Sequence, residues 1–73
     1  MTRAEHLQWS KDRANSILDS GGLIENAFAS MVSDLKKHDD LRDHSAIQLG
    51  MMMLLGGHFS SVDDMRKFIN GFN

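Results

Sequence analysis

The sequence predicts an all-α fold, a compact bundle of about four short helices. Apolar residues recur at intervals of three and four, and no segment shows sustained alternation of apolar and polar residues. Glycines separate the apolar runs, and proline is absent. Residues that typically cap helices stand at the borders of these runs. Together the three observations favour short helices joined by short loops.

The first predicted helix begins after Thr2. Thr2 and Glu5 form a capping box, in which a hydroxyl and a carboxylate accept hydrogen bonds from unpaired backbone N–H groups. The helix is expected to stop at Gly21 and Gly22, because glycine adopts the left-handed conformation at little cost. Its apolar stripe consists of Ala4, Leu7, Ala14, Ile17 and Leu18.

A second helix is predicted from about Leu23 to Lys37. Lys36 and Lys37 suit its C-terminal end, where the helix dipole favours positive charge. The link to the first helix is only two to four residues long, so the two helices should form an antiparallel hairpin. The apolar stripe of the second helix comprises Ile24, Phe28, Met31 and Leu35, with Ala27 and Val32 beside it.

The third predicted helix, Ala46 to Leu55, carries three consecutive methionines. Ser45 and Gln48 resemble a second capping box at its start. Apolar side chains surround this helix almost completely, which is typical of a buried helix, so we expect it to be central in the bundle. Alternatively, one flank of it lies at a subunit or partner interface. The burial of Met51, Met52 and Met53 distinguishes the two interpretations.

A fourth helix is predicted after Ser60 or Ser61, either of which suits the N-cap position. Asp63 and Asp64 would lie in its positively polarised first turn. Gly71 is expected to end it in the left-handed conformation. Its apolar side consists of Val62, Met65, Phe68 and Ile69.

The length and composition narrow the possible functions. Seventy-three residues predict one helical domain over residues 1–73, and the absence of cysteine excludes disulfides and thiol catalysis. The net charge is −2 without a basic cluster, so nucleic acid is not the expected partner. Because no apolar run approaches the ~20 residues of a membrane span, and no signal-peptide pattern is present, we expect a soluble cytoplasmic protein.

Trp9 is the first candidate for binding a protein partner. On a helical wheel it lies opposite the apolar stripe, beside Glu5 and Arg13, and Arg13 one turn later can stack on its ring. Tryptophan and arginine often dominate the energetics of interfaces. We therefore expect Trp9, Arg13 and Glu5 to contact a partner. The alternative is that Trp9 packs beneath the C-terminal segment around Phe72.

Candidate residues for self-association lie around the end of the third helix, where a small protein with an apolar flank can meet its own copy. These residues are Met52, Leu55 and Phe59.

No pattern indicates catalysis, a metal or a cofactor. His38 and His44 flank an acidic segment, but their spacing matches no metal-ligand pattern, and histidines in such a loop can instead cap helix ends. Consecutive methionines on a helix diverge and would not converge on a copper ion. Nucleophile-elbow, phosphate-loop and zinc-protease motifs are absent. We expect a protein that is not an enzyme.

Two resemblances add context. The segment Arg13–Asp40 resembles one tetratricopeptide-type helix pair, although it lacks the closing proline. The runs "EHLQWSKDRA", "AFASMVSDLKKH", "LGMMMLLGG" and "MRKFINGFN" resemble those of small uncharacterised all-helical proteins encoded in bacteriophage and prophage genomes. The second resemblance implies an accessory protein that acts in the cytoplasm of a bacterial host.

The sequence therefore favours a small phage-type accessory protein, and possible homodimer, that binds a host or phage protein and masks it. Two alternatives stay open. One is a nucleic-acid-associated regulator of the helix-turn-helix type, and the other is a small virion assembly component.

Overall fold

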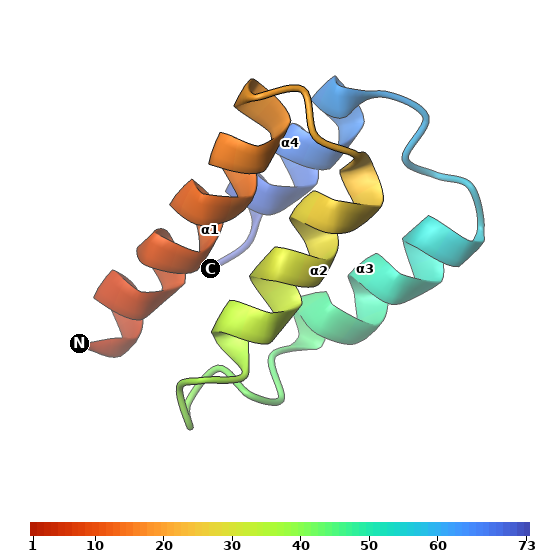
Figure 1. Cartoon of the computed structure of the whole chain (residues 1–73). Coiled ribbons are helices and arrows are strands. Elements are labelled where there is room, and N and C mark those ends of the chain that lie inside the picture. Colours follow the sequence, from red (N-terminus) through yellow and green to blue (C-terminus); the bar gives the residue numbers. More distant parts are fainter.

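The computed structural model describes residues 1–73 and contains four helices and no strand. The helices are α1 (Arg3–Asp19), α2 (Ile24–Leu35), α3 (Ser45–Leu55) and α4 (Val62–Gly71), as Figure 1 shows. The predicted all-α bundle is confirmed, and so is the antiparallel hairpin of α1 and α2.

The position of α3 differs from the prediction. α1 and α3 lie on opposite sides of α2, which also packs against α4, so α2 is the central helix (Figure 1). The prediction of a central α3 was wrong, because the apolar stripes of α1, α2 and α4 pack against one another. α3 therefore packs along one edge of the bundle and is covered on one side only.

The start of α1 and the turn after it follow the prediction. The Thr2 hydroxyl accepts from the Glu5 backbone N–H at 3.1 Å, and the Glu5 carboxylate accepts from the Thr2 N–H at 3.0 Å. Gly21 has a φ of +83°, the left-handed conformation expected of the turn between α1 and α2. These local signals therefore define the hairpin.

Two predicted helix ends are different. The N-cap of α3 is His44, whose Nδ1 accepts from the Ala46 N–H at 3.0 Å, so Ser45 lies inside the helix and the predicted Ser45–Gln48 capping box is wrong. Gly71 is the last residue of α4 and is not left-handed. The chain leaves α4 through the extended residue Phe72, whose carbonyl and ring contact Lys11 of α1. This tertiary contact takes the place of a glycine cap. At the start of α4, Ser61 is confirmed as the N-cap.

The hydrophobic core lies where α1, α2 and α4 meet. α3 contributes one residue to it, and the otherwise polar loop before α3 contributes a fully buried leucine. The core residues are Leu7, Ala14, Leu18, Ala27, Phe28, Met31, Leu35, Leu41, Ile47, Met65 and Ile69.

At Gly50, α3 lies in close contact with two aromatic rings. A Cβ atom built there would lie 2.3 Å from Cε1 of Phe28 and 3.0 Å from Cε2 of Phe68. Only a residue without a side chain fits between these rings in this arrangement. The close approach of α3 to these rings therefore depends on Gly50, and the contact with Phe28 positions α3 against α2.

Candidate protein-interaction surface

The side of α3 that faces away from the bundle is mostly apolar, and its exposed polar residues are the uncharged Ser45 and Gln48. Leu49, Met51, Met52 and Leu55 are 54%, 49%, 70% and 86% exposed, and we call these four residues the α3 face. The helix contains no charged residue. Single exposed apolar residues are ordinary on a protein surface, whereas a contiguous apolar patch marks an interaction site.

The three consecutive methionines have different environments because successive residues on an α-helix point about 100° apart. Ala46, Ile47 and Gly50 turn toward the bundle and are buried. Met53 is half-buried, whereas Met51 and Met52 belong to the exposed side. The burial of the methionines thus favours the interface interpretation of this helix over the core interpretation.

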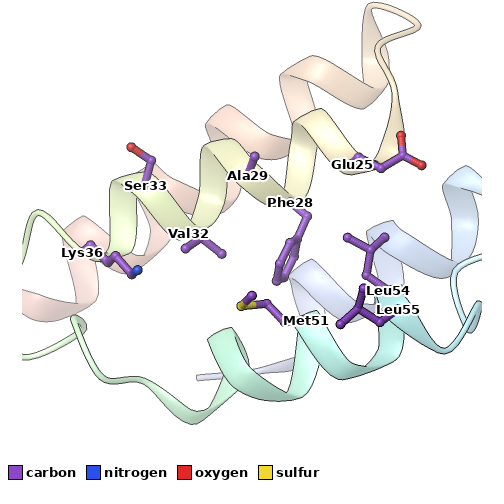
Figure 2. Close-up of a pocket in the computed structure, with 9 residues that line it drawn as sticks. All are labelled: Glu25, Phe28, Ala29, Val32, Ser33, Lys36, Met51, Leu54 and Leu55. Atoms are coloured by element: carbon purple, nitrogen blue, oxygen red, sulfur yellow. The ribbon is translucent and has the colours of Figure 1, made fainter.

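An open groove runs beside the α3 face, between α2 and α3. Its volume is about 560 Å³. Figure 2 shows Glu25 near one end of the groove, Lys36 near the other, and the Phe28 ring pointing into it. Its lining consists of Glu25, Phe28, Ala29, Val32, Ser33, Lys36, Met51, Leu54 and Leu55. The groove has an apolar floor and one charge of each sign at its ends.

The predicted self-association residues do not all share this surface. Met52 and Leu55 lie on the α3 face. Phe59 is half-buried and packs against the core, with its ring centroid 5.3 Å from that of Phe68. The structure therefore brings Met52 and Leu55 together and places Phe59 with the core. Leu49 and Met51 complete the face. Their spacing of three and four residues from Met52 and Leu55 could have indicated that they share a helix side with those two residues.

The predicted Trp9 site is on another part of the molecule. The Arg13 guanidinium lies 4.9 Å from the centroid of the half-buried Trp9 ring, so the predicted stacking is confirmed. Lys37, which follows the C-terminal end of α2, lies 5.7 Å from the same ring, and the His6 ring is 5.1 Å away. Trp9 thus packs beside the end of α2 and not beneath the C-terminal segment. Glu5 is exposed and occupied in the capping box of α1.

A buried carboxylate holds the cations around Trp9. Asp34, whose side chain is almost fully buried, lies 2.9 Å from Nε of Arg13 and 3.1 Å from Nζ of Lys37. The Arg13 N–H is not aligned with Oδ2, which accepts no hydrogen bond. Nε2 of His6 lies 2.6 Å from the backbone carbonyl oxygen of Asp34. This cluster links α1 to the end of α2, and no pattern in the sequence indicates that Asp34 is buried.

Lys11 is also buried, although it is a lysine on a surface helix. Its Nζ donates to the Phe72 carbonyl and lies 4.5 Å from the centroid of the Phe72 ring. Burial lowers the pKa of Lys11 below its ordinary value. Leu7, Lys11, Ala14 and Leu18 share one helix side, so helical spacing alone was sufficient to place this residue at the core.

Two other kinds of site, a basic surface patch and a metal site, are not formed by the charged residues. Arg13 and Lys37 are paired with Asp34, and Arg66 lies 2.7 Å from Asp19, so these cations are not arranged as a free basic patch. No three histidine, aspartate or glutamate side chains lie close enough together to hold a metal ion.

None of the four helices combines the length and the apolar character needed to cross a membrane.

Comparisons with known proteins found no match for this chain among protein-family models, curated proteins or solved structures.

Proposed function

We propose that this protein is a non-enzymatic binding module whose α3 face and adjoining groove receive an apolar surface of another protein chain. The observation that carries the proposal is the exposure of Leu49, Met51, Met52 and Leu55 on one uncharged helix. A groove between two helices is a common receptor for the apolar side of an amphipathic helix. We propose no catalytic role for the polar groups of the groove, Glu25, Ser33 and Lys36.

The exposed apolar surface is large enough to matter energetically. The exposed fractions of the four side chains together equal about two and a half fully exposed residues. Burial of one such side chain is worth about 1.5–3 kcal/mol, so covering the α3 face yields about 4–8 kcal/mol before the entropic cost of association. This range corresponds to partners bound with modest affinity when the face acts alone.

A second contact with the partner is proposed at Trp9 and Arg13, with Glu5 beside them. Half of the Arg13 side chain is exposed, and it stacks on the partly exposed Trp9 ring. Such a pair can extend an interface centred elsewhere, because aromatic and guanidinium groups are frequent anchors. Because of the resemblance to phage-encoded proteins, we propose a host or phage protein as the partner and masking of that protein's own binding surface as the mechanism.

The proposal is tested by site-specific photo-crosslinking followed by titration. A photo-reactive residue at position 52 should capture the partner in cells of the natural source, whereas the same residue at Gln8 on α1 serves as the position control. The captured protein is then purified and titrated. Leu55→Glu should weaken its binding at least tenfold, because a charge replaces a side chain that is 86% exposed before binding.

Leu23→Glu is the matched control variant, since Leu23 is also exposed but lies neither on α3 nor in the groove lining. Trp9→Phe tests the second contact while keeping an aromatic ring beside Arg13. Unchanged binding of the captured protein to Leu55→Glu contradicts the proposal. A steep loss of wild-type affinity with salt would instead favour a charged surface, such as that of a nucleic acid.

A further inference from the structure

We propose that the α3 face docks on a second copy of this chain, with the two α3 helices antiparallel about a two-fold axis. The α3 face of each copy then lies against the groove between α2 and α3 of the other copy. This inference rests on the proposed function, since it assigns an occupant to the same surface.

The charges at the ends of the groove favour this occupant. Glu25 and Lys36 lie at opposite ends, and neither makes an ion pair or a side-chain hydrogen bond within the chain. A two-fold rotation about an axis perpendicular to the groove exchanges its ends, and an isologous interface repeats every contact twice. Glu25 of each copy therefore faces Lys36 of the other, so two opposite-charge pairs form.

The same charges select the direction of packing. A parallel arrangement of the two grooves would place Glu25 against Glu25 and Lys36 against Lys36, which is repulsive at both ends. α3 itself adds no charge that could oppose either arrangement. The other charged groups at the Lys36 end, Arg42 and Asp43, line the adjoining hollow and carry opposite signs. The antiparallel arrangement is thus the complementary one.

The length of the groove along α2 matches the length of α3. Glu25 and Lys36 are separated along α2 by about 16 Å, at 1.5 Å of rise per residue. The 11 residues of α3 span about the same length. A copy of α3 therefore fits between the two end charges, with Met52 of each chain close to the two-fold axis.

The size of the surface predicts a weak dimer. A standard interface buries ~800 Å² on each partner. That is about one fifth of the 4470 Å² surface of this chain. We infer a smaller contact here, because the α3 face has only four exposed apolar residues. Interfaces at the low end of the size range are transient, so we expect dissociation in the micromolar range.

Sedimentation velocity of the full chain tests the inference over concentrations from about 1 µM to about 1 mM, which bracket the expected dissociation constant. The wild type should shift from 8.2 kDa to twice that mass as concentration rises. Leu55→Glu should raise the dissociation constant at least about tenfold, because it places a charge in the apolar interface. Leu23→Glu should dimerise like the wild type. Circular dichroism of each variant verifies that the helices are retained.

Charge reversal tests the direction of packing. Glu25→Lys alone and Lys36→Glu alone should each weaken the dimer, because two like-charge contacts replace two attractive ones. The double variant E25K/K36E should restore dimerisation to about the wild-type level, a result that an unrelated partner would not produce.

The outcomes separate this inference from the proposed function. A wild-type chain that stays monomeric throughout, or a dimer that survives Leu55→Glu, overturns the copy-on-copy docking. A double variant as weak as the single ones overturns the antiparallel arrangement. None of these results bears on whether the captured protein of the photo-crosslinking experiment binds the α3 face, which is measured by its own titration.

Discussion

Replacing Gly50 with alanine has two opposing effects on stability, a steric clash with Phe28 and a better helix propensity. The added Cβ would lie 2.3 Å from Cε1 and 2.8 Å from Cζ of Phe28, whereas carbon atoms pack at about 3.5–4.0 Å. Either the Phe28 ring or α3 must therefore retreat by more than about 1 Å. The ring is nearly buried, and Phe68, at 6.4 Å between centroids, limits its movement on one side, so a shift of the ring must use space on the side of the groove.

The sizes of these two effects determine whether Gly50→Ala raises or lowers the free energy of unfolding. Overpacking in a core costs about 1–3 kcal/mol, and the better helix propensity of alanine returns about 0.8–1.0 kcal/mol. We expect Gly50→Ala to lower the free energy of unfolding by about 1 kcal/mol, which corresponds to a decrease of about 4–8 °C in the melting temperature of a domain this size.

Gly71→Ala is the matched control for this prediction. Gly71 also lies in a helix, but nothing is within 4 Å of a Cβ added there and its φ is not in the left-handed range. This variant should be neutral or more stable by up to about 1 kcal/mol. Urea unfolding followed by circular dichroism measures both. If Gly50→Ala were stabilised as much as Gly71→Ala, the close approach of α3 to Phe28 and Phe68 would be refuted.

Three further predictions concern charged groups. Hydrogen bonds within the helix caps lower the pKa of Glu5 below 4.5 and that of Asp64 below 3.8. The two carboxylates therefore stabilise the fold fully above about pH 5, and this stabilisation is lost as the pH falls through the lowered pKa values. In urea titrations at acid pH, Glu5→Gln should lose less stability than the wild type. Burial lowers the pKa of Lys11, so just below pH 10.5 the unfolded chain binds more protons than the folded chain does. The free energy of unfolding should therefore rise with pH in that window. In alkaline urea titrations, Lys11→Met should abolish this rise. Asp34→Asn should lower the free energy of unfolding by only about 1–2 kcal/mol in the same assay, because the freed Arg13 and Lys37 side chains are already half-exposed to water; a loss of 4 kcal/mol or more would contradict this account.

Local signals made much of the fold predictable. The Thr2–Glu5 capping box, the glycine turn and the apolar stripes of α1 and α2 each depend on neighbours within a few residues, so the sequence reveals them directly. Prediction failed where a distant residue decides the outcome. Phe72 contacts Lys11 across 61 positions of sequence, and Asp34 finds Arg13 on another helix.

The candidate surface was only partly predictable for a similar reason. An apolar sequence such as that of α3 is compatible with a core helix and with an interface helix, and the packing of the other three helices decides between them. The interpretation of the loop histidines as helix caps is confirmed at His44, since a neutral imidazole nitrogen can accept a hydrogen bond, but the sequence also offered Ser45, a more usual capping residue, one position later. Leu41 was missed because its neighbours are polar.

The use of methionine on the α3 face has a chemical consequence. Met51 and Met52 are exposed to solvent, whereas Met31 and Met65 are fully buried in the core. Oxidants convert exposed methionine into a polar sulfoxide, and reductases reverse the change. Oxidative stress would therefore make this surface polar while leaving the interior of the protein intact. Binding of the kind proposed for the α3 face would then be lost and regained without unfolding.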